Sequence, residues 1–156
     1  MISIQKLFFI IMITLAVTAC HKENVREDEY LIFGHFYGFC SGEMCIETFQ
    51  IKDQMLFEDT KDQYRSLTEF NFIGLPQSKY ELVKNITDQI PANLWNEENE
   101  KVFGCPDCYD QGGYLIQLHR NGMTKSWILD KNPKDVPDYL NGFMDNIDEA
   151  IKLIHQ

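Results

Sequence analysis

The sequence predicts an α+β fold, in which an antiparallel sheet of about five strands carries two helices on one face. Three observations indicate it: short aromatic and aliphatic segments early in the chain, an Asn-Gly turn between two alternating segments, and two segments with helical periodicity. In chain order the expected elements are β-β-β-α-β-β-α. Because 156 residues suffice for one ordinary domain, we expect a single globular domain over residues 30–156.

Three strands are expected in the first half of this domain. Tyr30–Phe39 is rich in aromatic and aliphatic residues, and Gly34 and Gly38 within it indicate a bulge or a close approach of two backbones. Cys45–Ile51 and Met55–Glu58 follow, separated by a short polar turn.

One helix is expected after a long connection. Ser78 and Glu81 have the spacing of a capping box, with Ser78 as the N-cap, and apolar residues then recur at helical spacing until Pro91 ends the helix. The connection over residues 59–77 contains aromatic and aliphatic side chains, so parts of it are expected to pack onto the core.

A hairpin and a last helix complete the predicted fold. Asn121-Gly122 supplies the two positive-φ residues of a type I′ turn, which joins two strands over Tyr114–Leu129. Pro137 begins an amphipathic helix. The residues expected on the core side of the hairpin and of this helix are Tyr114, Ile116, Leu118, Trp127, Leu129, Leu140, Phe143, Met144, Ile147, Ile151 and Ile154.

The first nineteen residues have the pattern of a secretory signal. Lys6 precedes an uncharged run, Leu7–Ala19, whose length falls short of the ~20 apolar residues that span a bilayer as a helix. The run ends in Val17–Cys20, where small side chains suit a peptidase that binds an extended chain. The thiolate of Cys20 is the one nucleophile there that readily takes a thioether lipid.

Val17–Cys20 resembles the lipobox of bacterial lipoproteins. The resemblance implies that residues 1–19 are removed as a signal peptide, and that Cys20 becomes the mature N-terminus and carries thioether-linked lipid and an N-acyl chain such as palmitate. Residues 20–29 then form a charged tether. Because His21 rather than Asp follows the cysteine, the resemblance also implies the outer membrane, with the periplasmic or surface face left open. An ordinary cleaved signal and an uncleaved short anchor are the alternatives.

The charge composition argues against two classes of binding partner, nucleic acid and anionic lipid. The formal net charge is −10, from 24 acidic against 14 basic residues, and no basic stripe is present. This balance disfavours nucleic acid, whose phosphates require clustered cations. It equally disfavours electrostatic binding to anionic lipid, so any attachment to a membrane must come from apolar groups.

The body of the chain resembles small bacterial envelope lipoproteins of unknown function. The shared features are a glycine-rich first strand at Gly34–Gly38, a CPxC turn at Cys105–Cys108 and a C-terminal amphipathic helix over Pro137–Ile154. The resemblance implies a location in the envelope, but it implies no activity.

Lipid on Cys20 leaves four cysteines in the domain, Cys40, Cys45, Cys105 and Cys108. An oxidising compartment outside the cytoplasm favours disulfides. Four cysteines allow three connectivities, and their spacing does not choose among them. Pairing between the two halves would close loops of about sixty residues and contribute about 4 kcal/mol, more than local pairs contribute.

Two other uses of these four cysteines stay open. The spacing of Cys40 with Cys45 and of Cys105 with Cys108 also fits the two half-sites of a zinc centre. The Cys105–Cys108 segment further looks like a thioredoxin-type redox pair, although the residues after it lack the helix that would stabilise a thiolate.

Sequence motifs give no support to an enzyme. The chain contains no H-E-x-x-H, no G-x-S-x-G and no phosphate-binding glycine loop. The sequence therefore predicts a lipid-anchored envelope protein without a cofactor, more a non-enzymatic binding or structural domain than an enzyme. Its expected partner is a protein or another envelope component. The alternative is a zinc-binding or thiol-redox protein that uses the four cysteines.

Overall fold

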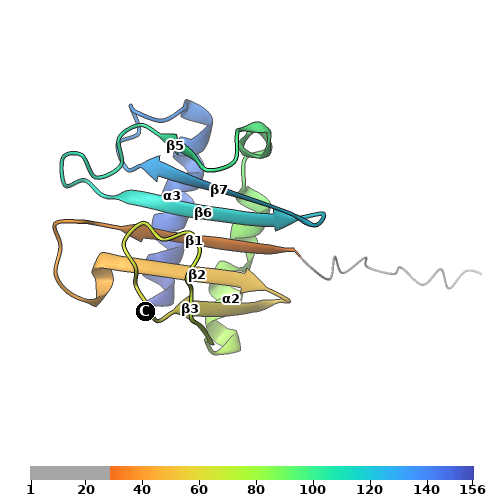
Figure 1. The fold of residues 1–156 in the computed structure, drawn as a ribbon. Coiled ribbons are helices and arrows are strands. Elements are labelled where there is room, and N and C mark those ends of the chain that lie inside the picture. Colours follow the sequence, from red (N-terminus) through yellow and green to blue (C-terminus); the bar gives the residue numbers. More distant parts are fainter. Residues whose placement is uncertain (1–28) are drawn as a thin grey trace, which may run out of the picture.

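The structure, a computed structural model, describes residues 29–156, with the backbone alone at Glu43. It is an α+β domain with one seven-stranded mixed sheet (Figure 1). The expected signal peptide, Cys20 and most of the expected tether lie outside the described residues. Among residues 29–156, none of the helices is both long and apolar enough to cross a membrane.

The sheet has the strand order β4-β3-β2-β1-β6-β7-β5. The strands are β1 (Tyr30–Phe36), β2 (Ile46–Lys52), β3 (Met55–Asp59), β4 (Phe72–Gly74), β5 (Lys101–Phe103), β6 (Gly113–Arg120) and β7 (Met123–Asp130). The helices are α2 (Gln77–Val83) and α3 (Asp138–Ile154), with 3-10 turns η1 (Glu43–Cys45), η2 (Lys84–Gln89) and η3 (Ala92–Asn96).

The predicted α+β class is confirmed, whereas the predicted sheet of about five antiparallel strands is wrong in detail. β4 and β5 are additional strands, and β5 runs parallel to β7, which makes the sheet mixed. Each of the two has only three residues, so neither is long enough to show the alternation by which a strand is recognised in sequence.

Strand β1 lies at the centre of the sheet and pairs along its whole length with β2 on one side and β6 on the other. Both of its faces are covered, because all residues from Leu31 to Phe36 are buried. At Gly34 an added Cβ would overlap the carbonyl oxygen of Glu47 and lie 2.9 Å from the Cα of Thr48. The predicted close approach of two backbones is therefore confirmed at Gly34, whereas Gly38 lies beyond the end of the strand.

The core fills the space between the sheet and both helices, which lie on the same face (Figure 1). The hairpin side chains predicted to face the core are all buried there, as is the predicted stripe of α3. The hairpin turns through Asn121 and Gly122, whose φ values of 54° and 74° are those of the predicted type I′ turn.

The predicted capping box is wrong. Helix α2 begins at Gln77, directly after Pro76, and no side chain caps it. Ser78 therefore lies inside the first turn, because the extended backbone of Pro76, with ψ 143°, already determines where the helix begins. The α-helix ends at Val83 and continues as the 3-10 turn η2.

The segment over residues 60–71, here called the strap, crosses the face of the sheet opposite the helices (Figure 1). The Tyr64 ring packs edge-on against Phe36, and the amide of Gln117 donates to the Leu67 carbonyl oxygen at 3.0 Å. Both partners point away from the helices, since they alternate with the core residues of β1 and β6. The prediction that parts of this connection pack onto the core is confirmed at Leu75, which packs against the core cluster, whereas the strap itself packs on the opposite face of the sheet.

Replacement of Gly34 by Ala is expected to lower the free energy of unfolding by about 1–3 kcal/mol, because the methyl group has no space between β1 and β2. The matched control is Gly142→Ala in α3, where nothing lies within 4 Å of an added Cβ. There the change is expected to stabilise by about 0.5–1 kcal/mol. Denaturant unfolding of both variants is the measurement, and an unchanged Gly34→Ala variant would contradict the close approach.

Candidate functional site

Three irregular segments meet at one end of the sheet and are here called the loop cap: residues 37–45, 60–66 and 104–112. Phe36 at the end of β1 pairs with Ile46 of β2 and with Gly113 of β6, so the first and third segments leave the same end. The start of β1 lies at the other end, where Tyr30 pairs with Lys52 and His119 (Figure 1).

Each cysteine pair forms a local disulfide within the loop cap. Cys40 is bonded to Cys45 and Cys105 to Cys108, with 5.6 Å between the Cα atoms in each pair. Of the connectivities that the sequence left open, the structure therefore has the local one. The structure brings all four cysteines to one end of the sheet without joining the two pairs. Within residues 29–156, no group of three or more histidine, cysteine and carboxylate side chains is placed to hold a metal ion.

The carboxylate of Asp107 joins the three segments of the loop cap. Its Oδ2 accepts hydrogen bonds from the Gly38 amide at 2.7 Å and from the Tyr64 hydroxyl at 2.8 Å. Its Oδ1 accepts from the Gly112 amide at 3.0 Å. Asp107 itself has φ 64°, a left-handed conformation that Asp tolerates better than most residues.

A second carboxylate, that of Asp130, holds the third segment to the sheet. Asp130 ends β7 and is only 1% exposed. Its oxygens accept from the Cys105 amide at 2.9 Å, from the Gln111 side chain at 2.9 Å and from the Asn132 amide at 2.8 Å. A buried carboxylate with several donors is well satisfied, so this contact fixes the base of the third segment.

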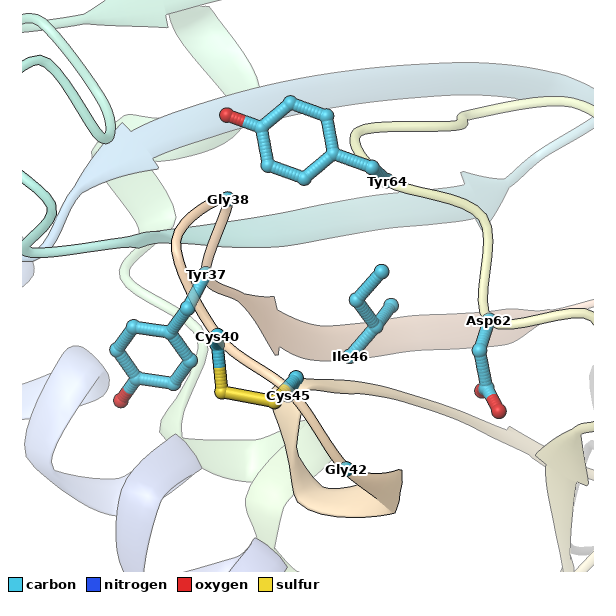
Figure 2. A pocket seen from close by; sticks show the side chains of 8 residues that line it. All are labelled: Tyr37, Gly38, Cys40, Gly42, Cys45, Ile46, Asp62 and Tyr64. Carbon is cyan, nitrogen blue, oxygen red and sulfur yellow. A yellow bond between two sulfur atoms is a disulfide. The ribbon is translucent and has the colours of Figure 1, made fainter.

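A cavity of about 500 Å³ opens between the first segment and the start of the strap. Figure 2 shows the Cys40–Cys45 disulfide on one side, Tyr64 and Asp62 on the other, and Ile46 between them. Partial burial and the neighbouring Asp107 carboxylate raise the pKa of the Tyr64 hydroxyl, which keeps it protonated as a hydrogen-bond donor. A volume of this size falls within the range of ligand pockets.

Two aromatic side chains project from the loop cap into solvent. Phe39 directly precedes Cys40 and Tyr109 directly follows Cys108, and each is 88% exposed. Met44, in the same segment as Phe39, and Tyr64, in residues 60–66, are about half exposed, at 49% and 45%. Since the Gly38 amide is hydrogen-bonded to Asp107, the two segments that carry Phe39 and Tyr109 are in direct contact.

Polar side chains form a row beneath the loop cap, on the helix side of the sheet. Glu47, His35 and Tyr114 lie on neighbouring strands at paired positions, and here they replace the apolar residues found further along those strands. Asp148 of α3 accepts a hydrogen bond from the Tyr114 hydroxyl at 2.6 Å and another from Lys131 at 2.9 Å. The Nδ1 of His35 lies 4.0 Å from Asp148, an ion-pair distance too long for a direct hydrogen bond.

Two contacts connect this polar row to the first segment of the loop cap. The Nε2 of His35 lies 3.1 Å from the carbonyl oxygen of Met44, and the ammonium of Lys131 donates to the Tyr37 hydroxyl at 2.6 Å. Lys131 also lies over the rings of Tyr37 and Tyr114, at 4.8 Å and 4.5 Å from their centroids. The polar row therefore positions the base of the loop cap.

Burial and neighbouring side chains shift the pKa values of three residues of the row. Burial alone would raise the pKa of Asp148, but interactions with His35, Tyr114 and Lys131 outweigh it and lower this pKa from 3.8 to about 2. Burial and the Asp148 carboxylate raise the pKa of Tyr114. Burial also raises the pKa of Glu47, and the Glu58 charge adds to this effect, while His155 at 3.3 Å opposes it.

The sequence pointed to the cysteines but not to the residues that organise the site. Asp107 was visible only as the third residue of the CPxC turn, and the roles of Asp130 and Asp148 depend on contacts 17 or more residues apart in the chain. A sequence does not show which donors the fold will bring to a given carboxylate. These residues therefore could not be identified from motifs.

Asp148→Asn is expected to lower the free energy of unfolding at neutral pH by about 1 kcal/mol, at the low end for charged hydrogen bonds because half of the side chain is exposed. A carboxyl group with a lowered pKa stabilises the fold above pH 3.8 and loses this effect as the pH falls to about 2. Unfolding followed between pH 2 and 7 is expected to show a steeper loss for the wild type than for the variant. Equal slopes in that acidic window would contradict the assignment.

No protein-family model matches the chain, and a comparison with curated proteins gives no match. Its function is therefore inferred from its residues and their arrangement.

Proposed function

We propose that this protein is a lipid-anchored, non-enzymatic protein of the cell envelope whose domain binds another envelope protein through the loop cap. The observation that carries the proposal is the exposure of Phe39 and Tyr109, each 88%, on two segments that are braced by disulfides and joined by Asp107.

Exposing aromatic rings to water costs free energy, which a binding partner recovers by covering them. Large aromatic side chains gain free energy when they leave water, and they are enriched where proteins bind each other. Phe39 and Tyr109 stand next to disulfide-bonded cysteines, so their backbones are held in place before any partner arrives. Such preorganisation reduces the entropy lost on binding. The cavity beside Cys40–Cys45 offers a recess for a side chain of the partner.

The position of the cap relative to the proposed anchor supports a partner away from the anchoring bilayer. The chain enters the domain at Tyr30, and the cap lies beyond the other end of β1. The strand has seven residues, and its six steps of about 3.3 Å put these ends about 20 Å apart. The surface has no excess of cations to bind anionic lipid, as the net charge is −10. His21 supports the outer membrane as the site of anchoring, through the resemblance to lipoproteins.

The environment of Cys105 and Cys108 favours this proposal over thiol catalysis. The Cys105 amide donates to the Asp130 carboxylate, and Asp107 lies between the two cysteines. Negative charges disfavour a thiolate, which a redox catalyst needs as its nucleophile.

The zinc alternative has its own test: intact mass and metal content of the protein purified with an alkylating agent. We expect two disulfides and no metal; four alkylated thiols with one zinc per chain would replace the proposal.

Cys20→Ser is expected to abolish incorporation of labelled palmitate and to block processing before residue 20, since serine offers no thiol for the thioether. The measurement is radiolabelling together with electrophoretic mobility of the precursor. Cys40→Ser is the matched control, because it removes a cysteine of the folded domain and is expected to leave labelling intact. A Cys20→Ser protein that is still labelled with palmitate would refute the lipid anchor.

Photo-crosslinking tests the binding surface in cells. With p-benzoylphenylalanine at position 39 or 109, we expect protein adducts of one common mass, because both rings belong to the same surface. The control position is Met123, which is 54% exposed at the opposite end of the sheet and is expected to give no such adduct. Absence of adducts at 39 and 109, adducts to lipid alone, or the same adducts from position 123 would contradict the proposal.

A further inference from the structure

We propose that the Cys105–Cys108 disulfide is a redox-sensitive switch of the loop cap: its reduction releases Asp107 and separates the three segments. The switch itself depends only on the geometry of the domain. Its role as a regulator of partner binding rests on the proposed function.

Accessibility distinguishes the two disulfides. Cys105 and Cys108 are both exposed, whereas in the other pair Cys40 is exposed and Cys45 is buried, at 8% exposure. Thiol–disulfide exchange begins with direct attack of a thiolate on one sulfur, so its rate depends on access. An external reductant therefore has two exposed cysteines to attack in Cys105–Cys108 and one in Cys40–Cys45.

The Cys105–Cys108 disulfide constrains the residue that joins the cap. Asp107 lies inside the loop that it closes, with φ 64°, and its amide donates to the Gly112 carbonyl oxygen at 3.0 Å. Asp adopts positive φ more readily than most residues, and the short loop closed by the disulfide restricts its backbone further. Once the cross-link opens, Asp107 is free to return to negative φ. Its carboxylate then leaves the Gly38 amide and the Tyr64 hydroxyl.

The domain beneath the cap does not depend on this disulfide. The Asp130 carboxylate, at the end of β7, accepts a hydrogen bond from the Cys105 amide, and Pro106 is buried beside Gly113. The main core cluster, between the sheet and the helices, contains none of the four cysteines. A disulfide that closes so short a loop also contributes least to global stability. Reduction is therefore expected to open the cap while the sheet stays folded.

The redox step requires a dithiol of the envelope as reductant. One of its thiolates attacks a sulfur of the disulfide and forms a mixed disulfide, and its second thiol then displaces the remaining cysteine. Two electrons and two protons pass to the protein. Cys105 and Cys108 become thiols, and the reductant becomes a disulfide.

Hydrogen–deuterium exchange of the full lipidated chain in detergent micelles tests the switch without a binding partner. The variants are Cys105→Ser/Cys108→Ser, Asp107→Ala with both disulfides intact, and Cys40→Ser/Cys45→Ser as the matched control. Exchange at Gly38 and Gly112, whose amides donate to the Asp107 carboxylate, is expected to rise at least tenfold in the first two variants. At Gly112 it is expected to stay within twofold of the wild type in the control. Residues 114–119 of β6 report on the core and are expected to stay protected.

Wild-type protein treated with dithiothreitol gives the same readout if the double variant does not fold. Alkylation and mass spectrometry then establish which disulfide has opened. Earlier opening of Cys105–Cys108 with a protected β6 supports the switch. A cap that keeps its protection after this reduction overturns it, as does a cap that exchanges only together with β6. These outcomes leave the crosslinking test of the proposed function unaffected, because that test is made on the oxidised protein.

Discussion

The pairing of β1 on both sides is the constraint on which the rest of the structure depends. A strand that is hydrogen-bonded along both edges and buried on both faces has no freedom of register, because a slip of one residue would turn Phe33 away from the core. The same strand separates the entry of the chain at Tyr30 from the loop cap beyond Phe36. Its length therefore determines how far the exposed aromatic rings stand from the proposed anchor.

The local disulfides constrain individual segments of the loop cap, and carboxylates connect these segments to one another and to the sheet. Each disulfide constrains only a few residues, so neither connects one segment to another. The connection comes from Asp107 and its hydrogen bonds to Gly38 and Tyr64, which are exposed to water. Hydrogen bonds of this kind contribute about 1 kcal/mol each, far less than the long-range disulfide that the spacing also allowed. A cap joined in this way can open without unfolding the sheet.

Some of the acidic residues have structural roles that the net charge alone does not reveal. Asp130 accepts three hydrogen bonds at the end of β7, and Asp148 accepts from Tyr114 and Lys131. These carboxylates organise the cap and the polar row below it. Part of the charge of −10 therefore comes from carboxylates that accept hydrogen bonds within the domain, rather than from a surface that binds cationic partners.

The sequence by itself determined the α+β class, the core side of the hairpin and of α3, and the hairpin turn at Asn121-Gly122, because these follow from local periodicity and turn chemistry. For Gly34 it left a bulge and a close approach of two backbones open, and the structure has the close approach. Only the tertiary structure decided the short strands β4 and β5, the start of α2 and the pairing of the cysteines. A three-residue strand forms only by hydrogen bonding to a neighbouring strand of the sheet. Two pairs of cysteines, far apart in the sequence, are compatible with several disulfide pairings. The roles of Asp107, Asp130 and Asp148 likewise came from donors that the fold brings from distant parts of the chain, which no local pattern records.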